Sequence, residues 1–240
     1  LGLTLKGGED VRWLDSCFSG MADLASRWHM ALAGGDLSRS ALLHFSITAW
    51  GVVEHGDLRR GRARAGDMLF VYGETGLARV GLFALEGAET PEALDLVRQR
   101  YPAACAAHLR PEPKVEFGLA LAELAEREDA SDRVGLMDLS DGLARDLPRL
   151  LNSAASGLGA DITLPAEALH AEVRAFAEDR GEDAESFAFR GGEDYTLLGS
   201  CPPSLLASVE KLGARILGEI RPGALKLNGT PWTSPGFDHF

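Results

Sequence analysis

LMDLSDGLARDL, residues 136–147, places three aspartates directly after an apolar stretch. The segment VGLMD (134–138) has the composition of a β-strand, LSDG (139–142) that of a turn, and LARDLPRLLNSA (143–154) that of a helix. When a helix follows a strand in this way, its first backbone N–H groups point outward and favour an anion. The stretch therefore predicts a sheet packed with helices, and it places a candidate site where the strand ends.

The aspartates of this stretch have two interpretations. In the structural one, Ser140 caps the helix and Asp141 interacts favourably with the helix dipole. That role leaves Asp138 unexplained, because a carboxylate at the end of an apolar strand costs desolvation. In the chemical one, Asp138 and Asp141 are two hard oxygen ligands for Mg²⁺, which combines carboxylates with water and phosphate oxygens. The residues alone leave both interpretations open.

Strand-like and helix-like segments are mixed along the rest of the chain without strict alternation. Further strands are predicted at 1–5, 42–53, 68–73, 160–165, 215–220 and at the end of 189–200. Further helices are predicted at 11–30, 74–85, 90–101, 171–181, within 108–129 and after 201–204, and the glycine pair within 33–40 breaks the pattern. We expect an α+β fold with mixed or antiparallel sheets and packed helices in two subdomains, rather than a doubly wound Rossmann fold. The turn near 104–112 predicts an N-terminal domain of 1–107 and a C-terminal domain of 108–240.

The composition argues against several classes of partner. The chain has 240 residues, 45% of them hydrophobic, and a formal net charge of −12 at pH 7. Such a charge repels nucleic acid and anionic membrane, so we expect neither as a partner. No apolar run approaches the length of a membrane span. Three cysteines without a CxxC pair argue against a disulfide framework, and a cytoplasmic location is expected.

Two further turns combine a glycine pair with acidic residues. Residues 34–36 read GGD, and residues 191–194 read GGED before a predicted strand. Glycine lets the backbone come close to a ligand, and an adjacent carboxylate could bind a metal. An ordinary turn is the simpler interpretation of GGD taken alone. Together with the turn at Ser140, however, the three motifs suggest one site assembled from several loops.

The segment GDLRRGRARAGD (56–67) is basic in an otherwise acidic chain. Its arginines could neutralise nucleotide phosphate, or they could form a solvated surface loop. Both interpretations hold if one arginine binds phosphate and the others are exposed. No P-loop, GxGxxG, HExxH or GxSxG motif occurs, so any use of ATP has to rely on metals and carboxylates.

Taken together, these motifs resemble the thiamine-monophosphate kinase family of the aminoimidazole ribonucleotide synthetase-like superfamily. The resemblance rests on AGGDLSRS, the stretch from Arg60 to Asp67 before MLFVYG, HLRPEPKVEFG, MDLSDGLARDL, FRGGEDYTLL and the terminal GFDHF, in that order. HLRPEPKVEFG and the DHF ending favour this family over the selenophosphate synthetases and the hydrogenase-maturation ATPases of the same superfamily. The resemblance implies ATP-dependent, Mg²⁺-assisted phosphorylation of thiamine monophosphate to thiamine diphosphate, by direct transfer and in a homodimer.

The resemblance also implies roles for particular residues. The Mg²⁺ ligands that it implies are Asp36, Asp138 and Asp141. The residues that it places near ATP are Phe18, Gly35, Asp36, Arg60 and Ser140. Glu193 and Phe237 would hold the thiamine moiety, although Phe237 and Phe240 could instead only pin the tail to the core. No side chain is expected to act as a covalent or acid–base catalyst, because positioning and metal ions do most of the work in phosphoryl transfer.

The family also has an N-terminal segment with GDDA-type and STD-type motifs and a further aspartate, which has no counterpart in the chain that starts at Leu1. We therefore expect this chain to hold only part of the metal site and not to turn over on its own. Two alternative functions follow. One is a catalytically incomplete protein that binds a nucleotide or thiamine phosphate, and the other is a different ATP-using activity of the same superfamily.

Overall fold

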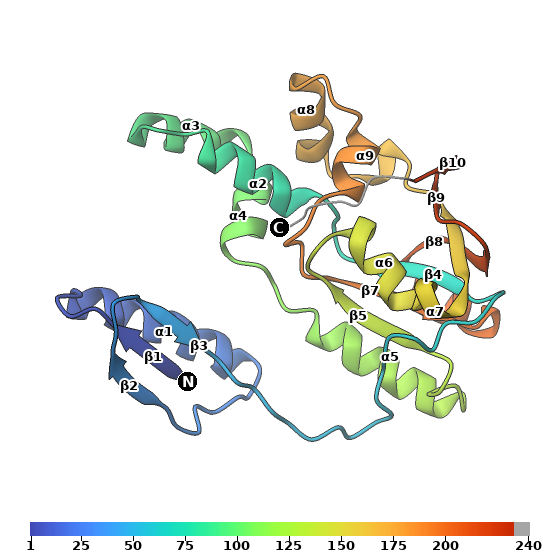
Figure 1. Ribbon diagram of the computed structural model, residues 1–240, viewed down its shortest axis with the longest axis horizontal. Coiled ribbons are helices and arrows are strands. Elements are labelled where there is room, and N and C mark those ends of the chain that lie inside the picture. Colours follow the sequence, from blue (N-terminus) through green and yellow to red (C-terminus); the bar gives the residue numbers. More distant parts are fainter. Residues whose placement is uncertain (233–240) are drawn as a thin grey trace. The chain divides into compact units, whose positions relative to one another are not determined.

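The computed structural model describes residues 1–232, apart from the side chains of residues 153 and 154. The chain divides into two compact units, Leu1–Val52 and the part from Val53 onward. The elements of both are labelled in Figure 1. Among the described helices, none combines the length and the apolar composition that crossing a bilayer requires.

The first unit is a three-stranded sheet with one helix (Figure 1). Strand β1 (Gly2–Leu5) lies in the middle, with β2 (Asp36–Arg39) parallel to it and β3 (His44–Ser46) antiparallel. Helix α1 (Val11–Arg27) begins at Asp10, whose carboxylate accepts a hydrogen bond of 2.9 Å from the backbone N–H of Arg12. Trp13 of α1 meets Phe45 of β3 edge to face, with ring centroids 6.3 Å apart. That contact joins the helix to the sheet.

Two local predictions in the first unit are wrong. The segment 33–40 was expected to break the pattern, but its second half forms β2, since pairing with β1 supplies hydrogen bonds that a local pattern does not reveal. The strand expected over 42–53 extends only from His44 to Ser46. Residues 47–53 are exposed and pair with no described strand. Their β-branched and aromatic side chains fit a strand, but no neighbouring strand is available to them.

The second unit contains a seven-stranded sheet with the order β10-β9-β6-β8-β4-β7-β5. The strands are β4 (Met68–Tyr72), β5 (Gly135–Leu139), β6 (Leu158–Ile162), β7 (Thr196–Cys201), β8 (Arg215–Pro222), β9 (Lys226–Leu227) and β10 (Thr230–Pro231). All neighbours are antiparallel except β6 and β9, which are parallel. The predicted α+β fold with mixed and antiparallel pairing is confirmed.

Helices cover both faces of this sheet (Figure 1). The helices of the second unit are α2 (Leu77–Glu86), α3 (Pro91–Arg100), α4 (Pro102–Leu109), α5 (Val115–Arg127), α6 (Leu143–Leu151), α7 (Ser153–Ser156), α8 (Ala171–Asp179), α9 (Ala184–Phe189) and α10 (Leu206–Lys211), with short 3-10 helices at Ala166–Ala168 and Pro203–Leu205. Leu69 and Val71 of β4 pack with α2, α6, α8 and α9, whereas Phe70 packs with α5 and α10. The two-residue period of a strand thus supplies side chains to two cores.

The compact units divide between Val52 and Val53, whereas the sequence suggested a boundary between residues 107 and 108. Strand β4 pairs with β7 on one side and β8 on the other, so its hydrogen bonds tie residues 68–72 to residues 196–222. The proline-rich turn after α4 connects two helices within the second unit. A turn rich in proline indicates a break in local structure, but only strand pairing decides which unit a segment joins.

Candidate functional site

Three glycine-containing turns meet at one edge of the second unit, and we call them the turn cluster: residues 73–76, 140–142 and 191–194. The backbone N–H of Glu193 donates to the carbonyl of Ser140 at 2.7 Å. A Cβ added to Gly142 would lie 2.3 Å from the carbonyl oxygen of Gly191, and one added to Gly76 would lie 2.7 Å from Cα of Ala188. Side chains would not fit here, so glycine permits the three backbones to approach. Two of the three predicted turns therefore lie together, and the turn at residues 73–76, which was not predicted, joins them.

The turn after β5 is not capped as the sequence suggested. Helix α6 begins at Leu143 with Gly142 as its N-cap, at φ 91° and ψ 159°, and no side chain caps it. Ser140 is therefore not the helix cap. The carbonyl of Ser140 is used by the neighbouring turn, and the carboxylate of Asp146 accepts a hydrogen bond of 2.8 Å from the backbone N–H of Asp141. The local motif was compatible with a serine cap, but packing against residues 191–194 decided the geometry.

Asp138 is exposed, which overturns the argument that its carboxylate costs desolvation. It pairs with Leu197 in the ladder between β5 and β7, and β5 is the edge strand of the sheet. No hydrogen bond or ion pair joins its carboxylate to any residue within 1–232. Asp138 is therefore an acidic group available to a ligand, on a rigid strand.

Asp141 and Asp146 share one arginine. Arg149 Nη1 contacts Asp141 Oδ2 and lies 2.7 Å from Asp146 Oδ1. Asp146 is fully buried, and this desolvation raises the pKa of its carboxyl, opposed by the hydrogen bonds from Asp141 and Arg149. Arg149 thus compensates a buried charge and holds Asp141 beside it. Asp146 and Arg149 were not among the predicted site residues, although their i, i+3 spacing places them on one side of the predicted helix.

Asp194 links the GGED turn to the helix that follows β4. Its carboxylate accepts hydrogen bonds from the backbone N–H groups of Gly76 at 2.6 Å and Ala78 at 3.0 Å, where α2 begins. Desolvation raises the pKa of Asp194 to about 7, against the lowering effect of these hydrogen bonds. This residue fixes the turn to α2, and nothing local in the sequence indicated a partner 118 residues away.

Glu193 has a left-handed backbone, with φ 64°, which is uncommon for a residue other than glycine. Its side chain is half exposed, and its Oε2 atom lies 3.1 Å from Nδ1 of His108 on α4. The Nδ1 atom is buried and forms no hydrogen bond with a described residue, so the contact is close but not aligned. Backbone strain of this kind persists where surrounding structure imposes it, as it does at many ligand sites.

The arginine loop leaves one arginine free. Arg59 and Arg62 contact Asp57, and Arg64 lies 3.2 Å from Asp132. Arg60 is exposed and forms no ion pair within the described part of the chain, while the next residue, Gly61, donates its N–H to the carbonyl of Leu150 at 2.8 Å. The residues on either side of Arg60 thus hold the loop in place, and the Arg60 side chain remains available to an anion.

The remaining predicted residues are not part of the turn cluster as described. Phe18, on α1 and half-buried, belongs to the first unit, as do Gly35 and Asp36. A Cβ on Gly35 would lie 2.4 Å from the carbonyl oxygen of Leu1, so packing by itself accounts for that glycine. Asp36 is exposed, and the Ser38 hydroxyl donates to it at 2.8 Å. Phe237 lies outside the described residues.

The acidic residues suit a divalent cation only in combination with other ligands. Within residues 1–232, no group of three His, Cys, Asp or Glu residues is placed to hold a metal ion. Mg²⁺ needs fewer protein ligands than that, since one or two carboxylates plus water and substrate phosphates complete its octahedron. Asp138, exposed and unpaired, and Asp141, already balanced by Arg149, fit such a site when a phosphate is bound.

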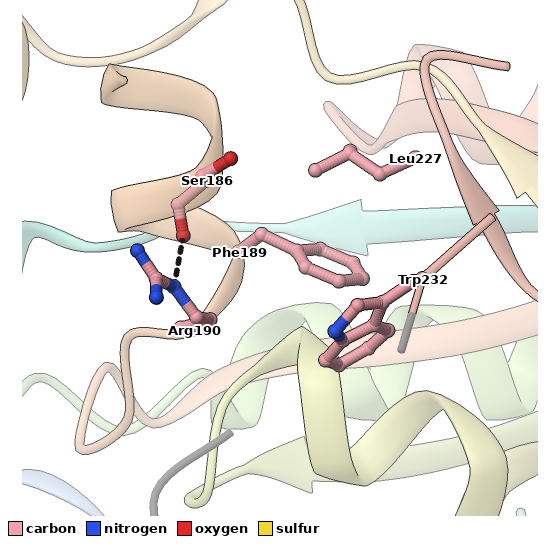
Figure 2. A pocket seen from close by; sticks show the side chains of 5 residues that line it. All are labelled: Ser186, Phe189, Arg190, Leu227 and Trp232. Atoms are coloured by element: carbon pink, nitrogen blue, oxygen red, sulfur yellow. Dashed lines mark hydrogen bonds between the residues drawn. The ribbon is translucent and has the colours of Figure 1, made fainter. Parts of the chain in front are cut away.

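A separate hollow of about 190 Å³ lies between α9 and the β9–β10 hairpin. Figure 2 shows its lining, formed by Ser186, Phe189, Arg190, Leu227 and Trp232. Phe189 and Trp232 meet edge to face with centroids 4.2 Å apart, and Arg190 Nε donates to the carbonyl of Ser186 at 3.1 Å. None of these residues was predicted as a site residue, although Phe189 and Arg190 belong to the FRGGEDYTLL motif.

The chain is similar to several thiamine-monophosphate kinases. The chain is 31% identical over its whole length to the thiamine-monophosphate kinase of Haemophilus influenzae, of which it covers 72%, and 34% identical over 92% of its length to that of Synechococcus elongatus, of which it covers 64%. A solved structure described as AaThiL complexed with AMPPCP and TMP superposes with a TM-score of 0.74 at 24% identity, covering 100% of this chain and 72% of that one. No family profile matches the chain. The chain spans between 51% and 72% of the length of the first three curated relatives.

Proposed function

We propose a reaction from one premise: the chain belongs to the thiamine-monophosphate kinase family, since it matches a 31% identical relative over its whole length. The proposed reaction transfers the γ-phosphoryl group of ATP to the phosphate of thiamine monophosphate. A new P–O bond forms to the acceptor phosphate, the bond between the β- and γ-phosphates breaks, and ADP and thiamine diphosphate leave. The alignment with that relative is the observation that carries the proposal.

The turn cluster supports this chemistry through its geometry. Phosphoryl transfer requires little covalent chemistry, so rigid positioning and compensation of charge account for most of the rate enhancement. The interlocked turns at residues 140–142 and 191–194 provide a rigid backbone beside Asp138 and Asp141. In this protein, with a net charge of −12, two anionic substrates have to meet, which calls for cations at the site.

The residues divide by their proposed partners. Asp138 and Asp141, with Asp36, hold Mg²⁺, which when bound neutralises developing charge on the phosphates. Arg60 contacts ATP phosphate, with Phe18, Gly35, Asp36 and Ser140 as the other nucleotide contacts that the family resemblance suggests. Glu193 and Phe237 hold the thiamine moiety. The unpaired state of Arg60 and the exposed carboxylates of Asp138 and Glu193 support these assignments.

We also propose that the protein is a homodimer, on the basis of the family resemblance. A cytoplasmic location is supported by the three cysteines, Cys17, Cys105 and Cys201, all of which carry free thiols.

A turnover assay with the purified full-length protein tests the reaction. ADP release and thiamine diphosphate formation are measured together, with and without thiamine monophosphate and with and without Mg²⁺. We expect both products in equal amounts, and only when both thiamine monophosphate and Mg²⁺ are present. ADP without thiamine diphosphate would indicate a different acceptor, and binding without any turnover would favour a binding protein.

A further inference from the structure

The positions of His108 and Glu193 are fixed from two independent sides. His108 lies in the last turn of α4, which packs against α2. A Cβ added to Gly81 of α2 would lie 2.2 Å from the carbonyl oxygen of Ala104 and 2.7 Å from Cβ of His108. This close helix contact fixes the backbone that carries the imidazole, while the hydrogen bond from the Glu193 N–H to the Ser140 carbonyl fixes the backbone that carries the carboxylate.

The contact between them is close but does not have the geometry of a hydrogen bond. Glu193 Oε2 lies 3.1 Å from His108 Nδ1, within hydrogen-bond distance, but the atoms are not aligned for a hydrogen bond. An unpaired buried nitrogen is costly, so a ligand that brings the carboxylate into line gains from the contact.

We propose that His108 is a positioning residue, whose Nδ1 holds the Glu193 carboxylate in the orientation that meets the thiamine moiety. The inference rests on the proposed function, because it assigns Glu193 to that substrate. The buried Nδ1 faces Glu193, so it acts through the carboxylate. Its effect is therefore confined to one substrate: the affinity for thiamine monophosphate depends on it, and the affinity for ATP does not.

Two substitutions of His108 distinguish the contribution of Nδ1 from that of Nε2. The side-chain nitrogen of asparagine lies near the place of Nδ1, whereas that of glutamine lies near the place of Nε2, and both are hydrogen-bond donors. In the full-length protein, His108→Asn is expected to keep the Michaelis constant for thiamine monophosphate within about twofold of wild type. His108→Gln is expected to raise it roughly tenfold, with kcat and the Michaelis constant for ATP unchanged.

A double-mutant cycle gives a second measurement. If His108 acts through Glu193, His108→Gln adds nothing to the effect of Glu193→Gln, because the contact is already lost. Thermal unfolding of all variants shows whether a change reflects stability, and calorimetric binding of thiamine monophosphate gives a readout without turnover. Equal effects of Asn and Gln, full additivity with Glu193→Gln, or a rise confined to ATP would each overturn the inference. Absence of thiamine monophosphate binding by the wild type would instead overturn the proposed function.

Discussion

Asp138 and Asp141 have different surroundings, which gives their substitution different consequences. Asp138→Asn is expected to lower turnover on the order of a thousandfold, as loss of a metal ligand does, without a change in melting temperature, because its carboxylate has no partner among residues 1–232. Asp141→Asn is expected to lower turnover similarly and also to reduce stability slightly, since it loses Arg149. Turnover at limiting Mg²⁺ and thermal unfolding measure the two effects.

Asp95→Asn is the matched control for these variants, because it removes one charge from an exposed position on α3. It should leave both turnover and stability close to wild type. Near-normal turnover of Asp138→Asn at limiting Mg²⁺ would show that the metal assignment is wrong.

Arg60 and Arg59 form a matched pair of exposed arginines in one loop. Arg60→Ala is expected to raise the Michaelis constant for ATP roughly tenfold, since a charge-assisted contact to phosphate is lost. Arg59→Ala removes an exposed side chain that contacts Asp57, and its effect is expected to be small. Steady-state kinetics with varied ATP concentration measures both Michaelis constants. If the two variants raised the constant equally, Arg60 would not be a phosphate contact.

Arg62 is less exposed than the other arginines of this loop. Its side chain is only 20% exposed and donates to the backbone carbonyls of Asp57 and Ser131. Loss of Arg62 would therefore disturb the loop that carries Arg60, so it is not a suitable control for the phosphate contact.

At the scale of elements, the junction between β5 and α6 depends on Gly142. Its backbone conformation is one that residues with a side chain rarely adopt, and a Cβ would lie 2.3 Å from the carbonyl oxygen of Gly191. Gly142→Ala is expected to lower the free energy of unfolding by roughly 2–4 kcal/mol. Chemical denaturation measures it.

Gly118 lies in the same unit as Gly142, but its replacement is expected to stabilise the protein. It lies inside α5, and a Cβ there would meet no atom within 4 Å. Gly118→Ala is expected to raise the free energy of unfolding by about 0.5–1 kcal/mol, because alanine favours the helix. If both variants changed stability alike, close packing of the turn cluster would not be the cause.

The connection between Asp194 and α2 makes stability depend on pH. The folded-state pKa of about 7 lies above the ordinary value of 3.8, so the folded protein binds this proton more tightly than the unfolded chain does. The stabilising contribution is complete below about pH 4 and is lost as pH rises towards about 7.

Asp194→Asn removes the titration of this carboxyl group. Relative to that variant, the wild type is therefore expected to be more stable at pH 5.5 than at pH 8, by at most about 2 kcal/mol. Urea denaturation of both proteins at the two pH values tests this, and an opposite trend would contradict it.

At the scale of the whole molecule, the two units differ in how much core they contain. Both hydrophobic cores lie entirely beyond Val53, whereas Leu3 is the one fully buried hydrophobic side chain among residues 1–52, all of which the structure describes. A fragment of residues 53–240 is expected to unfold cooperatively in urea, and a fragment of residues 1–52 is expected to remain unfolded, because it buries too little apolar surface. Circular dichroism during denaturation distinguishes these outcomes. A non-cooperative transition for the larger fragment would contradict the division.

The sequence by itself determined the features that depend on local pattern. MLFVYG was predicted as a strand and residues 90–101 as a helix, and both elements are present. The order of motifs predicted the family, which the relatives confirm. The SDG and GGED turns were also recognisable, because glycine and acidic residues at a strand end have few other uses. Such signals lie within a few residues of one another, where backbone preference and side-chain period act directly.

Only the tertiary structure decided the features that depend on distant partners. Pairing of β4 with β7 and β8 assigned residues 68–72 to the second unit, and the edge position of β5 left Asp138 exposed. Asp194 found its donors in the N-terminus of α2, and three arginines of the basic loop found carboxylates while Arg60 did not. Burial and pairing of a charged group depend on which segments pack together, and no local pattern in the chain contains that information.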